Sequence, residues 1–385
     1  MRHELVICRR RAGFVVAMRV PAMTLVGALY EPLVLSGRKG EKERSSTPPS
    51  HPNKTGQTRP MNDLQSFADA FRGMKPWAGM VPRGYQVDFL GTLTDARFRV
   101  PFGIDPATVG GGQVATRLPT IEDGEGWFEA VNWVEAAREA RGRYVMMTLG
   151  ACYAAQAVGA YRALQALNPM PCKLVAVEAE PENCQWIRRH MRDNGIELDD
   201  HWLVPHALSE KNEPVLFPVG SPGTGAQNCV ATNEPKSREI YASEIIAAGR
   251  AEGALRDLLV HNTTGLTKDL VPGSNFMAEI KLVSAVTLGD ILGPFDRVDY
   301  LEADIQQSEI LVVPPFIDLL KRKVRRIHIG THGKDVHQAL HELFEKQGWE
   351  IIFAYAPNGK YSSDLGMFET NDGVLTVRNP DLQQA

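Results

Sequence analysis

The sequence lacks the cysteine arrangements that are typical of zinc and redox proteins. Its five cysteines are spread over 385 residues and no two of them form a C-x-x-C pair, so neither a zinc ribbon nor a thioredoxin-type motif is present. An odd number of cysteines in a chain of this size fits a reducing compartment better than an oxidising one. We therefore expect a cytoplasmic protein without a disulfide framework.

Long hydrophobic runs are also missing. The apolar stretch Val20–Tyr30 has only eleven residues, which is too few for a membrane-spanning helix. It follows three arginines, as the core of a signal peptide does, but Arg19 and Pro21 fit such a peptide poorly and no small-residue cleavage site follows. The sequence therefore predicts neither a membrane span nor a secretory signal.

An excess of basic residues is absent as well, since the chain has 42 Lys and Arg against 46 Asp and Glu. Residues 1–60 hold 11 basic and 4 acidic residues, so the other 325 hold 31 basic and 42 acidic ones. A mildly acidic body argues against general nucleic-acid binding, which needs a basic face. The hydrophobic content of 43% is sufficient for a large buried core.

The N-terminal part differs in composition from the rest. Residues 36–60 contain none of the hydrophobic residue types, and Met61 follows them directly. A segment of this kind cannot bury enough apolar surface to offset the entropy cost of ordering. We expect residues 1–60 to be a disordered or non-native basic extension; a basic tail that binds an acidic partner is the alternative.

Two further regions are expected after this extension. Residues 61–125 are predicted to form a helical and β segment that packs on the core, with β-rich runs at Val87–Leu93 and Ala96–Phe102. Residues 126–385 are predicted to form the main domain, with an insertion at 221–283. This insertion is either the segment that recognises the acceptor, closing as a lid, or a surface loop.

Strand and helix patterns alternate along the main domain. Strands are expected at Tyr144–Leu149, Leu174–Val177, His201–Leu208, Val298–Ile305, Arg326–Gly330, Glu350–Tyr355 and Gly373–Val377. Helices are expected at Ala151–Leu167, at Glu182–Asn194 and after Asp335, which would cap its helix with Gln338 three residues on. The alternation predicts an α/β fold, with a mostly parallel sheet and helices on both faces. Ligands bind such folds beyond the carboxyl ends of the strands.

Three of the predicted strand ends carry residues that suit a binding site. Gly150 allows the close approach of a ligand, or is simply part of a tight turn. Glu178 can accept hydrogen bonds from both hydroxyls of a ribose, as in NAD or S-adenosylmethionine, or is a solvated charge. Asp304 and His332 follow neighbouring strands, where an acid and an imidazole can share a proton transfer. Alternatively, these last residues belong to a network at a helix start.

The residue types near Asp304 also allow a metal site in principle. Asp304, Glu309 and His332 offer ligand atoms that hard or borderline cations accept. Nothing in their spacing requires a cation, however, so no metal is predicted.

Several blocks of sequence together resemble the FkbM family of S-adenosylmethionine-dependent methyltransferases. These blocks are Val175–Asn183 (VAVEAEPEN), His206–Glu210 (HALSE) and Val298–Glu309 (VDYLEADIQQSE). Further blocks resemble one branch of that family, namely Trp127–Ala154, Ile327–Gly333 and Asp372–Pro380. The resemblance covers roughly Val87 to Pro380, and it lies in the order and spacing of the blocks taken together.

The resemblance implies a Rossmann-like class I methyltransferase domain with seven strands, the last of them antiparallel, and S-adenosylmethionine as the cofactor. Gly150 would lie under the methionine part of the cofactor, where Thr148 stands at the position of the family's first acidic residue. Glu178 would bind the ribose hydroxyls. Ala207 and Leu208 would lie near the adenine.

The same resemblance implies the chemistry. Asp304 would sit beside the reacting methyl group, with Asp304 or His332 as the base that a hydroxyl needs. FkbM-like enzymes are generally associated with O-methylation of sugars and other hydroxyl-bearing metabolites. The expected partner is therefore a small-molecule hydroxyl acceptor such as a sugar or glycan.

The first motif diverges from that of the family, which usually has an acidic residue followed by three alternating glycines. Thr148 replaces the acid, Cys152 and Ala154 replace two glycines, and Gln307 replaces a glycine after the fourth strand. The missing carboxylate removes an expected anchor for the amino-acid end of the cofactor, and the added Cβ atoms narrow the approach to the backbone. A catalytically degenerate, methyltransferase-like binding protein is therefore the alternative to an active enzyme.

A nicotinamide-dependent oxidoreductase is a third interpretation that the predicted sheet and Glu178 permit. However, no G-x-G-x-x-G follows the first predicted strand. Glu178 also lies 28 residues beyond Gly150, against ~20 between fingerprint and acid in the dinucleotide pattern. The sequence thus favours the methyltransferase.

Overall fold

The structure is a computed structural model that describes residues 64–102, 104–219 and 279–382. The predicted extension, residues 1–60, and most of the predicted insertion lie outside the described residues. The end of the insertion is described: it forms strand β10, Glu279–Val283, which pairs antiparallel with β9, Val215–Val219.

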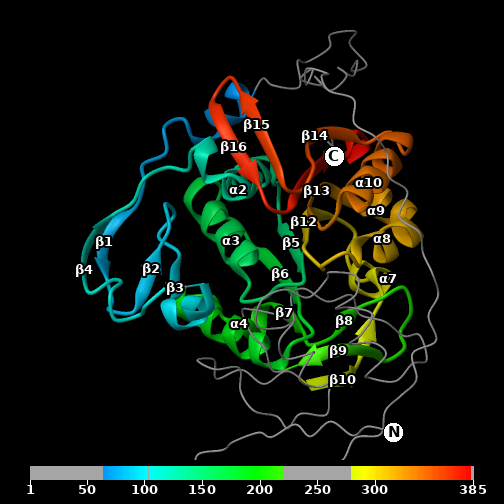
Figure 1. Cartoon of the computed structure of the whole chain (residues 1–385), viewed down its shortest axis with the longest axis horizontal. Coiled ribbons are helices and arrows are strands. Elements are labelled where there is room, and N and C mark those ends of the chain that lie inside the picture. The colour runs from blue at the N-terminus through cyan, green and yellow to red at the C-terminus, as the bar shows by residue number, and fades with distance from the viewer. Residues whose placement is uncertain (1–63, 103, 220–278, 383–385) are drawn as a thin grey trace, which may run out of the picture. The chain divides into compact units, whose positions relative to one another are not determined.

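A seven-stranded sheet forms the centre of the described chain (Figure 1). In spatial order its strands are β14 (Glu350–Tyr355), β17 (Gly373–Arg378), β13 (Val324–Thr331), β12 (Val298–Ala303), β5 (Tyr144–Leu149), β6 (Cys172–Val177) and β7 (Trp202–Val204). β17 runs antiparallel to both of its neighbours, β14 and β13, and the other neighbouring pairs in this sheet are parallel. The predicted Rossmann-like α/β architecture, a seven-stranded and mostly parallel sheet with the last strand antiparallel, is confirmed.

Helices cover both faces of this sheet, as Figure 1 shows. One hydrophobic core includes residues of α2 (Glu125–Glu139), α3 (Ala155–Leu167) and α4 (Pro181–Asp193). The other includes residues of α7 (Leu288–Leu292), α8 (Glu309–Val312), α9 (Ile317–Lys323) and α10 (Lys334–Lys346). None of the helices in the described ranges has both the length and the apolar character needed to cross a bilayer.

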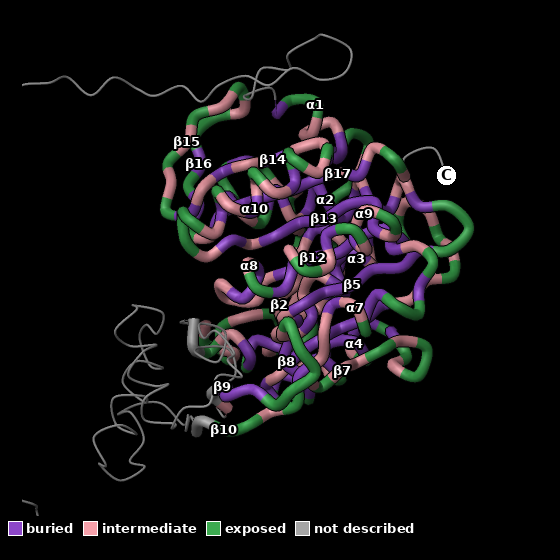
Figure 2. Tube along the Cα trace, turned by 90° about the vertical axis from the view of Figure 1, so that its right-hand side faces the viewer, coloured by how far each residue is buried: buried purple, intermediate pink, exposed green. Residues whose placement is uncertain are grey.

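Strand β5 illustrates why the sequence folds in this way. Tyr144 and Met146 belong to the first core, whereas Val145, Met147 and Leu149 belong to the second. All of its residues are buried, and Figure 2 shows buried segments running through the middle of the sheet. A nearly continuous apolar run is what a parallel strand needs when helices cover both faces.

Residues 64–125 pack against the first core. Their elements are α1 (Gln65–Ala68), β1 (Ala78–Val81) paired with β4 (Gly112–Ala115), and β2 (Tyr85–Val87) paired with β3 (Leu93–Asp95). Leu64, Phe71, Phe89 and Ile121 are buried in the same core as Trp127 of α2. The main domain therefore shares its core with the residues that precede it.

The first of the two predicted β-rich runs in this part is correct at its ends only, and the second is wrong. Val87 ends β2 and Leu93 begins β3, and the residues between them form the hairpin turn, because the Asp88 carboxylate accepts hydrogen bonds from the backbone of the residues that follow it. Ala96–Phe102 is a 3-10 helix. Asp95 accepts a hydrogen bond from the backbone N–H of Arg97 at 3.0 Å, and such local bonds compete with strand pairing.

The third predicted strand is divided in two. After β7 the chain reaches Pro205, which has no N–H to donate to a sheet. The following residues form β8 (Ala207–Leu208), which pairs with β11 (Ala285–Val286) outside the main sheet. A further hairpin, β15 (Gly359–Ser363) and β16 (Gly366–Thr370), lies between β14 and β17 in the sequence and was not predicted.

The predicted cap of α10 is also wrong. The helix begins at Lys334 after Gly333, and Asp335 lies within its first turn. The Gln338 side chain donates a hydrogen bond to Glu342 instead of completing a capping box. An acidic residue in the first turn still interacts favourably with the helix dipole.

Candidate functional site

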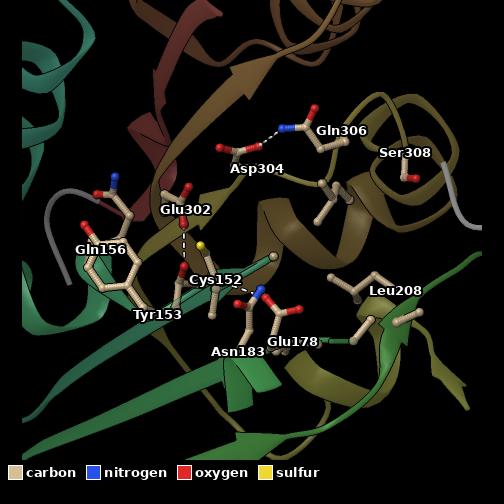
Figure 3. Close-up of a pocket in the computed structure, with 18 of the residues that line it drawn as sticks. Cys152, Tyr153, Gln156, Glu178, Asn183, Leu208, Glu302, Asp304, Gln306 and Ser308 are labelled. Carbon is tan, nitrogen blue, oxygen red and sulfur yellow. Dashed lines mark hydrogen bonds between the residues drawn. The ribbon is translucent and has the colours of Figure 1, made fainter. Parts of the chain in front are cut away.

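A cavity of about 470 Å³ lies at the carboxyl ends of β5, β6 and β12 (Figure 3). Strand β5 has β6 on one side and β12 on the other, so the order of strands reverses here. This is the place where open α/β sheets bind ligands. The predicted site residues that line the cavity are Thr148, Gly150, Glu178, Ala207, Leu208 and Asp304.

The loop after β5 keeps an unusual backbone conformation. Gly150 has a φ of +79°, and a Cβ there would lie 2.0 Å from the backbone oxygen of Asp304. The glycine is therefore required for the contact between this loop and the end of β12. Cys152, Ala154 and Gln307, which stand where the family has glycines, have positive φ values of 54°, 64° and 72°. Their backbone thus lies in the region that glycine adopts most easily.

Glu178 follows β6 and is 6% exposed. Its two oxygens accept hydrogen bonds from the backbone N–H groups of Cys152, at 2.6 Å, and Glu180, at 2.7 Å. Burial raises the pKa of Glu178 to about 7. The carboxylate is therefore fixed at the cavity wall, where its remaining lone pairs can accept hydrogen bonds from a ligand.

The cavity is lined by five carboxylate side chains, those of Glu129, Glu178, Glu302, Asp304 and Asp372. Arg99 and His206 are the basic residue types in the same lining. Burial raises the pKa of Glu129 to about 7 and raises that of Glu302 well above its usual range. So many acids around one cavity favour a ligand that carries positive charge.

Sequence reasoning missed three of these carboxylates, those of Glu129, Glu302 and Asp372. Glu302 did leave a signal, because it stands inside the predicted strand VDYLEADI, where a charge is costly unless it has a function or a partner. Glu129 lies on α2, where burial raises its pKa and the Gln156 side chain opposes that rise. Asp372 precedes β17, and no sequence signal separates it from an ordinary loop acid.

Asp304 and His332, the two predicted catalytic residues, lie next to each other. The Nε2 atom of His332 is 3.4 Å from Asp304 Oδ1 and 3.3 Å from Asp372 Oδ1, and its Nδ1 is 3.3 Å from Glu309 Oε1. Burial alone would lower the pKa of His332, but these three carboxylates outweigh it and raise the pKa to about 11. The imidazole is therefore protonated at neutral pH.

Asp304 is held from two sides. The Gln306 side chain donates a hydrogen bond to Asp304 Oδ1 at 3.0 Å (Figure 3). The Nε2 atom of His332 lies 3.4 Å from the same oxygen. The Asp304 side chain keeps 43% of its accessible surface, and it lines the cavity. Burial raises the pKa of Asp304 to about 6, although the positive charge of His332 opposes this rise. At neutral pH most of the carboxyl groups at this position are ionised.

Asp304, Glu309 and His332 also offer ligand atoms that all lie within 4.8 Å of one another, a set that can hold a cation. The pKa of His332, about 11, places a proton on both ring nitrogens at neutral pH. A protonated imidazole has no lone pair for a metal. A cation bound at this cluster would therefore have to displace the imidazole proton.

Comparison with curated proteins finds similarity to a protein of Jannaschia sp. (strain CCS1) described as a "Putative methyltransferase". The two are 27% identical over 213 residues, which are 54% of this chain and 63% of the relative. The chain thus matches less than two thirds of that relative's length. No family model matches the sequence.

Among solved structures, the chain is similar to methyltransferase FkbM from Methylobacillus flagellatus KT, with a TM-score of 0.33 and 10% identity over 68% of this chain and 56% of that one. A precorrin-6Y C5,15-methyltransferase from Geobacter metallireducens GS-15 has a TM-score of 0.32 and 12% identity, over 65% of this chain and 86% of that one.

Proposed function

We propose that the protein is an S-adenosylmethionine-dependent methyltransferase that methylates a hydroxyl group of a small molecule. The observation that supports this most is the set of five carboxylates around the cavity. S-adenosylmethionine carries a sulfonium and an ammonium, and opposite charges in a partly buried site attract strongly. The donor set therefore fits this cofactor, with Glu178 suited to its ribose hydroxyls.

The same carboxylates argue against a nicotinamide cofactor. NAD carries a negatively charged diphosphate, which dinucleotide-binding folds place at a helix N-terminus behind a glycine-rich turn. In this chain the corresponding loop faces Glu178, Glu302 and Asp304. Like charges at this range would oppose binding of the diphosphate.

When bound, S-adenosylmethionine supplies an electrophilic methyl group that an acceptor oxygen takes as the carbon–sulfur bond breaks. The residues of this chain then have two tasks. Asp304 accepts the proton of the acceptor hydroxyl, because its carboxylate is mostly ionised at neutral pH. His332 keeps its own proton and holds Asp304 in place. The cavity walls align the reactants and exclude water, which is the larger part of such catalysis.

The acceptor is proposed to be a sugar or another hydroxyl-bearing metabolite, in keeping with the resemblance to the FkbM family. The alternative, a degenerate protein that binds without turnover, rests on the missing glycines and the missing first acid. An assay of methyl transfer from labelled S-adenosylmethionine to a panel of hydroxyl compounds separates the two proposals, because only the enzyme labels an acceptor.

Thermal unfolding of the full chain tests the cofactor. A ligand at 100 times its Kd stabilises a protein by ~2.7 kcal/mol, and for a chain of this size we expect a rise in Tm of several degrees. S-adenosylmethionine and S-adenosylhomocysteine should each produce this rise, and NAD should not. A rise with NAD alone, or with none of the three at millimolar concentration, would contradict the proposal.

The stabilisation by S-adenosylmethionine should also increase with pH. Glu129 and Glu178 have pKa values of about 7, above the ordinary value of 4.5, so the folded protein binds more protons than the unfolded chain between these values. The stability of the ligand-free protein therefore falls as the pH rises through this window.

A cationic ligand favours the ionised carboxylates, so its Tm shift should be larger at pH 7.5 than at pH 5.5. The Glu129→Gln variant, which lacks one of the titrating groups, should show a smaller difference. An equal shift at both pH values would count against a role for these acids.

A further inference from the structure

Glu302 and Thr148 form a pair across two central strands. They are directly opposite in the parallel register of β12 and β5, and the Thr148 hydroxyl donates a hydrogen bond to Glu302 Oε2 at 2.5 Å. In Figure 3 a dashed line marks this bond at the labelled Glu302, which lines the cavity. Glu302 of β12 thus places a carboxylate beside Thr148. The resemblance to the FkbM family leads us to expect an acidic residue at the position of Thr148.

The Glu302 carboxylate has no compensating charge of its own. Its residue is 4% exposed, and within the described ranges no Lys, Arg or His forms an ion pair with it. Thr148 is its hydrogen-bond donor, and the other oxygen, Oε1, has no partner among the described residues. An ionised carboxylate in such a position is unfavourable unless a cation joins it.

Neighbouring acidic side chains make the ionised form of Glu302 still less favourable. After burial, the nearby negative charge of Asp304 contributes most to the raised pKa of Glu302, and Glu129 and Glu309 add to it. Glu129 and Asp304 line the same cavity as Glu302. A positively charged ligand group in that cavity would reduce the repulsion among all three carboxylates. The cavity therefore offers a cation subsite at the end of β12, where no ion pair from the described part of the chain compensates the charge of Glu302.

We propose that Glu302, oriented by Thr148, binds the ammonium group of the methionine part of S-adenosylmethionine. The carboxylate that the divergent first motif lacks on β5 is thus supplied by β12. Thr148 acts as a positioning residue for it. This inference rests on the proposed function, since it assigns a role to a group of the proposed cofactor.

The role of Glu302 can be tested by binding measurements with two thioether ligands. Neither ligand carries a sulfonium, so no methyl transfer takes place during the measurement. S-adenosylhomocysteine has the ammonium, and 5′-methylthioadenosine has the same adenosine and sulfur but no amino-acid end. In calorimetric titration, Glu302→Gln should weaken S-adenosylhomocysteine about 10- to 100-fold, as expected for a lost hydrogen bond to a charged group. The affinity for 5′-methylthioadenosine should change less than about threefold.

Two further variants sharpen this test. Glu342→Gln removes the same charge from an exposed position on α10 and should leave both affinities unchanged. The double variant Thr148→Asp with Glu302→Thr moves the carboxylate to β5 and should restore the preference for S-adenosylhomocysteine. Thermal unfolding of each variant verifies that it is folded before binding is measured.

The outcomes are distinguishable. If Glu302→Gln binds S-adenosylhomocysteine as the natural protein does, or weakens both ligands equally, the role of Glu302 is wrong while the proposed function stands. If the natural protein binds neither S-adenosylmethionine, S-adenosylhomocysteine nor 5′-methylthioadenosine, the proposed function fails and the assignment of Glu302 fails with it.

Discussion

The Asp304→Asn variant is expected to lose about 10²- to 10⁴-fold in kcat, the usual contribution of a positioned general base. Asparagine has nearly the same shape as aspartate and can still accept the hydrogen bond from Gln306, which lies 3.0 Å away in the natural protein. The variant therefore removes the proton acceptor and leaves the wall of the cavity in place. We expect its affinity for S-adenosylhomocysteine to change only a few-fold.

The matched comparison is Glu178→Gln, which should show the opposite behaviour. Glu178 lines the cavity and is proposed to bind the ribose of the cofactor, so its loss should weaken cofactor binding while kcat at saturation falls much less. In the natural protein kcat/KM should rise with pH around the pKa of Asp304, about 6. His332, with a pKa of about 11, should not titrate below pH 9. An Asp304→Asn variant with full turnover would remove Asp304 from the mechanism.

The Gly150→Ala variant should lower the free energy of unfolding by about 3–5 kcal/mol, the sum of backbone strain and overpacking. The new Cβ would lie 2.0 Å from the Asp304 backbone oxygen, and the φ of +79° is unfavourable for alanine. The contact is rigid, because the Asp304 N–H donates a hydrogen bond to the Leu149 carbonyl at 2.9 Å. Chemical denaturation of the full chain measures the loss.

Gly126→Ala is the matched control for this substitution. Gly126 lies in α2 and has no atom within 4 Å of the position of a new Cβ. Alanine favours a helix over glycine by about 1 kcal/mol, so this variant should be as stable as the natural protein or more stable. If both variants have the same stability as the natural protein, the contact between the β5 loop and β12 does not constrain residue 150.

Much of the fold could be predicted from the sequence because the central strands are buried on both faces. The run YVMMTL is short and apolar, VDYLEA is short with four of its six residues apolar, and they are followed by Gly150 and Asp304, so their positions and ends were found within two residues. Errors arose where a local polar group decides the conformation. Asp88, inside the first predicted β-rich segment, and Asp95, directly before the second, accept hydrogen bonds from backbone N–H groups and turn the chain there.

The candidate site could be predicted only where a strand end carries a polar residue. Asp304 and Glu178 were found by this rule, because strand ends can be located from periodicity. Glu129 and Asp372 reach the cavity through the packing of α2 and through the reversed strand β17, which follows Asp372. Such convergence of distant segments depends on tertiary contacts, which no local pattern contains.

The loop after β5 has a consequence for how distant relatives are detected. A glycine in a sequence motif often marks a backbone torsion angle that other residues adopt less easily, and in this chain Cys152 and Ala154 have such angles without being glycines. Neighbouring contacts hold the loop: the Cys152 N–H donates a hydrogen bond to Glu178, and the Val158 N–H donates one to the Ala154 carbonyl. Signatures written in amino-acid letters will pass over chains of this kind, whereas a profile of backbone dihedral angles along the loop would group them with loops that keep their glycines.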